Sequence, residues 1–150
     1  MPPSPSDEPL ARARELSAAI STATDALNAS LQRAQQALTE LNLGVTAAVP
    51  LYPQMSHAES HLDWRQFIRF GKDASGWRLI LESGHEGQDP EDWSESPLLN
   101  ASKEVRLQAV VRLPALLEQL VETAEAHLTS LKERAAEADA FASTVAKRKA

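Results

Sequence analysis

The sequence contains no cysteine, and this absence excludes disulfides, thiolate metal sites and a cysteine nucleophile. It also has no run of ~20 apolar residues that would cross a bilayer. Residues 1–20 lack the continuous apolar core behind a basic start that marks a secretory signal. We therefore expect a protein without a membrane span, located in the cytoplasm.

Catalytic motifs are also missing. The sequence has no Gly-rich phosphate-binding loop and no Ser-centred nucleophile elbow. His57 and His61 are four residues apart, but Glu59 is displaced by one position from the zinc-protease pattern. We expect no enzymatic activity, no catalytic residue, no metal ion and no cofactor.

The balance of charge disfavours general binding to nucleic acid. The net charge is -6, and the acidic excess lies mainly in residues 82–95. Contacts to phosphate need positive charge. The only basic run is Lys147, Arg148 and Lys149, which suits the carboxyl end of a helix.

Two heptad repeats, one near each end of the chain, are the strongest pattern in the sequence. Apolar or small residues recur at alternating steps of three and four, which keeps one stripe facing a partner helix. The first repeat comprises Leu10, Ala13, Ser17, Ile20, Thr24, Leu27, Leu31, Ala34, Leu38 and Leu41. The second comprises Leu117, Val121, Ala124, Leu128, Leu131, Ala135, Ala138, Ala142 and Val145.

The period changes to two between the repeats, which predicts strands at residues 43–51, 62–70 and 77–82. Turn-forming residues at 71–76 indicate a hairpin, and residues 83–97 read as a surface loop. A helix is predicted at 98–113, followed by a kink or restart at Pro114.

These patterns predict an α+β fold: a long antiparallel helical hairpin, or coiled-coil stalk, with an inserted three-stranded antiparallel β-meander covered by a helix. Residues 1–9 would form a flexible arm and 10–42 the first stalk helix. Residues 43–113 would form the head, and 114–150 the second stalk helix with its basic tail.

Four apolar residues lie off the narrow heptad stripe, and such a row usually marks another helix contact. They are Leu16, Leu116, Leu120 and Phe141. We expect them to support a homodimer or a higher oligomer. The alternative is that the head folds over them within a monomer.

The predicted hairpin pairs Phe70 with Trp77. The face expected to be buried carries Leu62, Trp64, Ile68, Phe70, Trp77, Leu79 and Leu81. The opposite face would carry the candidate partner-binding residues Arg65, Phe67, Arg69, Arg78 and Ile80. Arginines interleaved with apolar side chains favour an acidic partner. Alternatively, Glu82 or the acidic segment holds these arginines within the chain.

The sequence thus predicts a non-enzymatic protein-protein interaction or assembly module, which oligomerises through its helices and presents its head to a protein partner. One alternative is an accessory subunit that contacts nucleic acid through Arg65, Arg69, Arg78 and the basic tail. Another is a metal-dependent enzyme that uses His57 and His61.

Overall fold

The computed structural model describes residues 5–53 and 64–149, which form two long helices and a four-stranded antiparallel sheet of order β1-β2-β3-β4. The fold is therefore α+β, as predicted. The elements are α1 (Asp7–Leu41), β1 (Ala47–Pro50), β2 (Trp64–Asp73), β3 (Gly76–His85), the 3-10 turn η1 (Pro90–Asp92), β4 (Ser94–Pro97), the 3-10 turn η2 (Leu98–Asn100) and α2 (Lys103–Lys149).

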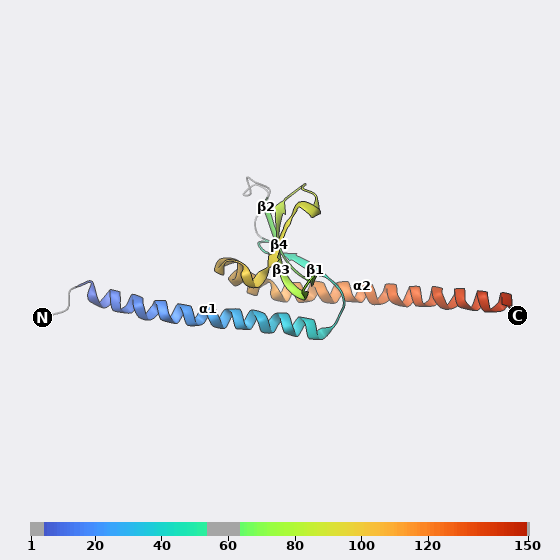
Figure 1. Cartoon of the computed structure of the whole chain (residues 1–150), viewed down its shortest axis with the longest axis horizontal. Coiled ribbons are helices and arrows are strands. Elements are labelled where there is room, and N and C mark those ends of the chain that lie inside the picture. Colours follow the sequence, from blue (N-terminus) through green and yellow to red (C-terminus); the bar gives the residue numbers. More distant parts are fainter. Residues whose placement is uncertain (1–4, 54–63, 150) are drawn as a thin grey trace.

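The two helices run in the same direction and are staggered, with the sheet on one side of the region where they overlap (Figure 1). The start of α1 and the end of α2 therefore lie at opposite ends of an elongated structure. The predicted antiparallel hairpin is not confirmed. A heptad pattern predicts which face of a helix is buried, but it does not predict the direction in which the helix runs. In this structure the apolar faces of both helices pack on the sheet region: α1 contacts β3 and η2, and α2 contacts β1 and β2.

The ends of the helices have local causes. Asn42 adopts a left-handed conformation (φ 52°) and donates its backbone amide to the Thr39 carbonyl, which ends α1. In contrast, α2 continues through Pro114, so the predicted restart there is wrong. Proline lacks the amide that would bond to the Val110 carbonyl, but packing of the surrounding turns on the sheet maintains the helix.

The β2–β3 hairpin is present, but it is tighter and longer than predicted. Asp73 pairs with Gly76 around a two-residue turn, and Gly76 has a φ of +116° that favours glycine. Phe70 consequently pairs with Leu79 instead of Trp77. This shift of two residues leaves each side chain on its predicted face because side chains alternate along a strand.

A fourth strand, β4, lies within the segment that the sequence predicted as a loop. Its residues Ser94–Pro97 pair with β3 from Ser83 to Ile80. Three of its four residues are exposed, so β4 lacks the apolar alternation from which a strand is predicted.

The core lies between the sheet and the overlapping parts of the helices. Leu31 of α1 is 1% exposed, which confirms its predicted burial, whereas Leu128 of α2 is 51% exposed and lies outside the core. The other fully buried large side chains are Leu51, Ile68, Leu79, Leu98, Leu116 and Leu120.

Polar side chains also tie the helices to the sheet and to each other. The Leu79 amide lies one residue beyond the last β3–β4 pair, and it donates to Gln35 Oε1 of α1 at 2.9 Å. Arg106 of α2 donates to the Asn28 side chain of α1. Gln35 thus satisfies a backbone group of a strand that would otherwise be buried without a partner.

Replacement of Gln35 by alanine should lower the free energy of unfolding by about 1–3 kcal/mol, because it removes the acceptor of the Leu79 amide. Urea denaturation measures this change. The matched control is Gln36→Ala, because Gln36 is exposed and bonds only along its own helix to Glu40. Equal stability of the two variants would contradict a structural role for the Gln35 contact.

Candidate functional site

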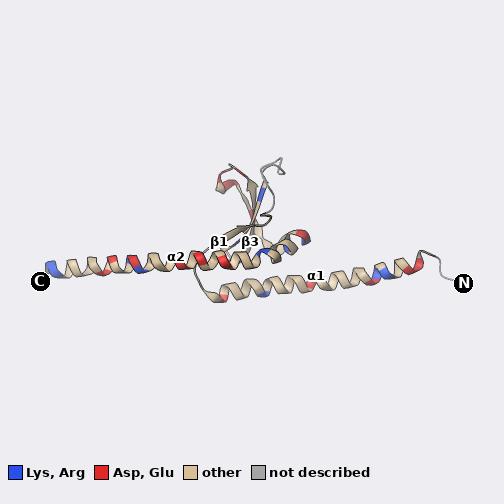
Figure 2. Cartoon of the chain, turned by 180° about the vertical axis from the view of Figure 1, so that it is seen from behind, with Lys and Arg blue, Asp and Glu red and all other residues tan. Residues whose placement is uncertain are grey.

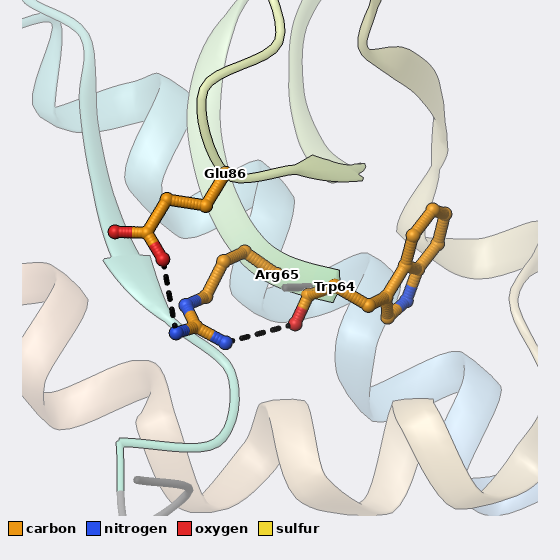
Figure 3. A network of polar contacts seen from close by, with 3 residues as sticks. All are labelled: Trp64, Arg65 and Glu86. Atoms are coloured by element: carbon orange, nitrogen blue, oxygen red, sulfur yellow. Dashed lines mark hydrogen bonds and ion pairs between the residues drawn. The ribbon is translucent and has the colours of Figure 1, made fainter. Parts of the chain in front are cut away.

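The outer face of the head carries the three arginines that the sequence singled out, and each is engaged by a carboxylate of the same chain. Arg65 donates to Glu86 Oε2 at 3.3 Å and to the Trp64 carbonyl at 3.2 Å (Figure 3). The ion pair connects β2 to the residue that directly follows β3. It corresponds to the alternative in which acidic residues of the head hold the arginines.

Arg69 is the most enclosed of the three arginines. Its guanidinium bonds to Glu82 on β3, and its Nη2 lies 2.9 Å from Glu95 Oε1 on β4. The Arg69 side chain is only 18% exposed, so it connects three strands more than it faces solvent. Arg78 is looser, with its Nε 3.8 Å from Asp73 Oδ1.

The two apolar residues of this candidate surface are also covered. Ile80 is 2% exposed. Phe67 is half-buried, and its ring centroid lies 5.7 Å from that of Trp93. The candidate partner-binding set therefore forms a second, smaller packed layer, on the side of the sheet away from the helices.

The Trp93 ring packs directly against the backbone of Gly84. Gly84 was not identified as important from the sequence. A Cβ at position 84 would lie 2.4 Å from the Trp93 ring, closer than real contacts allow. Glycine is therefore required here for close approach of the indole, and not for an unusual backbone angle. The sequence offered no signal of this contact, because Gly84 fell in the segment 83–97 that was predicted as a loop, whereas the structure places it in β3.

The exposed aromatic group of the head is Trp64. Its side chain was predicted on the buried face, but the residue is 43% exposed because it lies at the start of β2, beyond the core. Its ring meets His85 edge-on with centroids 5.0 Å apart. Trp64 thus offers an accessible apolar surface at the end of the hairpin.

The histidines proposed for a metal site, His57 and His61, lie outside the described residues. Within residues 5–53 and 64–149, no group of three or more His, Cys, Asp or Glu side chains is arranged to hold a metal ion.

His127 is exposed and borders a shallow apolar hollow, between the end of α1 and α2, that Leu43, Val121 and Leu128 also line. Over the same described ranges, neither helix is long and apolar enough to cross a membrane.

The four residues predicted to support oligomerisation divide into two pairs. Leu116 and Leu120 are 0% and 1% exposed, because α2 packs them against the sheet of its own chain. The alternative in which the head folds over them therefore applies to this pair. Leu16 and Phe141 are 43% and 71% exposed, in parts of the helices that extend beyond the core.

These extensions are the largest exposed apolar feature in the described part of the chain. Residues 7–23 of α1 and 125–148 of α2 have no buried or half-buried side chain. They nevertheless carry large apolar residues that are 40% exposed or more, namely Leu10, Leu16, Ile20, Leu128, Leu131, Phe141 and Val145.

Comparison of the chain with protein-family models, with curated proteins and with solved structures finds no match.

Replacement of Arg69 by glutamate should lower the free energy of unfolding by about 2–4 kcal/mol, because it brings a third carboxylate beside Glu82 and Glu95 in a partly buried position. Chemical denaturation gives the value. Arg78→Glu is the matched control: its ion pair is long and more exposed, so we expect a change below about 1 kcal/mol. A larger effect at Arg78 than at Arg69 would contradict this distinction.

Replacement of Gly84 by alanine should cost about 1–3 kcal/mol, because the added methyl displaces the Trp93 ring. The same substitution in a Trp93→Ala background should cost much less, since the clashing ring is gone. Thermal denaturation of the four proteins in this double-mutant cycle measures the coupling. Additive effects would show that Gly84 and Trp93 do not act on each other.

Proposed function

We propose that this protein is a non-enzymatic interaction and assembly module, which associates through the exposed apolar faces of its two helices and presents the sheet as a compact head to a protein partner. The observation that carries the proposal is that the face of each helix that covers the core continues past the end of that core and remains mainly apolar.

On α1, the stripe begins in solvent and ends in the core. Leu31 is buried and Leu27 and Leu38 pack against the same cluster. At heptad spacing the same face continues toward the N-terminus as Thr24, Ile20, Ser17, Ala13 and Leu10. Ile20 and Leu10 are each 51% exposed, so an apolar face that is buried in one half of the helix lies bare in the other.

On α2, the order is reversed. Leu116 and Leu120 are buried, and steps of three or four residues lead from them along the same face to Leu131, Ala138, Ala142 and Val145. Leu131 is 53% exposed. Beyond Leu131, every side chain of α2 that the structure describes is exposed, from residue 132 to residue 148.

Physical chemistry favours a partner for these segments. Most of the stability of a helix in a protein comes from packing of its apolar face, and isolated helical segments of this length are marginal in water. Contiguous exposed apolar surface on a folded protein usually marks an interaction site. The accessible Trp64 supports a further contact through the head, since tryptophan is a frequent anchor of protein interfaces.

The alternative role in nucleic-acid binding has less support. Arg65, Arg69 and Arg78 each have an acidic partner in their own chain, and the net charge is -6. Contacts to phosphate would have to displace these pairs.

Sedimentation equilibrium at tens of micromolar tests the proposal, with the expectation of a mass well above the 16.3 kDa of one chain. Ile20→Asp combined with Leu131→Asp should shift the mass toward the monomer without unfolding the head, because both residues lie outside the core. The matched control is Thr22→Asp with Ala136→Asp, which places the same charges on the opposite, exposed faces. A monomeric parent protein would contradict association through the helices.

A further inference from the structure

We infer that the partner of both helical extensions is a second copy of this chain, bound so that the free half of α1 in each copy lies antiparallel to the free half of α2 in the other. This inference rests on the proposed function, since it specifies how the helices associate. It is carried by the stagger of the helices, the match of their apolar stripes and the charges at their ends.

The stagger provides the geometry. Residues 7–23 of α1 extend about 25 Å beyond the core, and residues 125–148 of α2 extend about 35 Å in the opposite direction (Figure 1). Because both helices point the same way, a two-fold rotation across the long axis brings the free half of α2 from one copy beside the free half of α1 from the other. The two contacts are identical by symmetry, so the assembly closes as a dimer.

The apolar stripes of the two extensions have the same spacing, so they can pair residue by residue when the helices run antiparallel. Both repeats alternate steps of three and four, so an antiparallel register that sets Leu10 opposite Val145 also sets Ala13 opposite Ala142. In the same register Ser17 meets Ala138, Ile20 meets Ala135, and Thr24 meets Leu131. Each of these last two pairs combines a large side chain with a smaller one, which lets the helices approach closely.

The end charges favour the antiparallel direction. The first turn of α1 carries Asp7 and Glu8, and the last turn of α2 carries Lys147 and Arg148. Figure 2 shows these acidic and basic ends at opposite extremes of one molecule. In the antiparallel dimer the acidic start of α1 in each copy lies beside the basic end of α2 in the other, so this pairing occurs at both symmetric contacts. Each charge also interacts favourably with the dipole of its own helix end.

A parallel, head-to-tail arrangement would bring like charges together. The start of the free half of α1 would then lie beside the start of the free half of α2, so that Glu8 would approach Glu122 and Glu125. Such a contact would also leave one extension open at each end and continue into a filament.

Cysteine cross-linking tests the register, because the chain has no thiol of its own. Chains with Ala13→Cys and chains with Ala142→Cys are mixed and oxidised, and we expect a disulfide between the two kinds of chain. The matched control is Ala13→Cys mixed with Ala135→Cys, which lies on the same face about 10 Å along the helix, too far for a disulfide. Linkage of 13 to 135 in preference to 142 would overturn the register.

Charge reversal tests the direction. Asp7 lies opposite Arg148 in this register, so Asp7→Lys alone and Arg148→Glu alone should each weaken the dimer, by about five- to tenfold in its dissociation constant across the two symmetric contacts. The two substitutions in one chain should restore most of the affinity, since each reversed charge then meets its reversed counterpart in the other copy. Glu133→Lys, on the exposed face of α2 opposite the stripe, should have little effect. Additive weakening in the double variant would overturn the antiparallel pairing.

The mass separates the two proposals. A dimer that forms the 13–142 link supports both. A dimer without that link, or a mass that keeps growing with concentration, overturns the antiparallel pairing and leaves the proposed function standing. A monomer at tens of micromolar overturns both.

Discussion

The sheet has one strongly apolar face, and burial of that face is the constraint on which the rest of the structure depends. Ile68 and Phe70 on β2 project from it together with Leu79 and Leu81 on β3, and all four are buried. A single helix is too narrow to cover four strands, so α1 and α2 pack side by side on the sheet and contact different strands. The helices are consequently placed by the sheet rather than by each other, and each is free to continue past it.

Periodicity in the sequence predicted which residues share a face, because burial acts on faces. The heptad stripe of α1 correctly assigned Leu31 to the core. The alternation in β2 and β3 correctly assigned Ile68, Phe70, Leu79 and Leu81, although the predicted register was wrong by two residues. An even shift preserves every face, so the error in register affected only the pairing and the turn.

The parts that could not be predicted depend on contacts between distant residues. The direction of α2 follows from the path of the chain through the sheet, which no heptad records. The second repeat begins with Leu117 and Val121, whereas the neighbouring Leu116 and Leu120 enter the core, because the sheet and not a partner helix determines the buried face. The carboxylates that hold Arg69 come from β3 and β4, and β4 had no apolar pattern from which it could be recognised.

Both edges of the sheet are closed to the addition of another strand. The edge strands β1 and β4 have four residues each and end in Pro50 and Pro97, which lack the amide needed to pair with a further strand. At the β1 edge, Arg112 and Gln108 of α2 donate to the carbonyls of Pro50 and Leu51. Growth of the sheet into a cross-β ribbon is thereby obstructed, and a protein that carries much apolar surface on its helices is protected from aggregation through its strands.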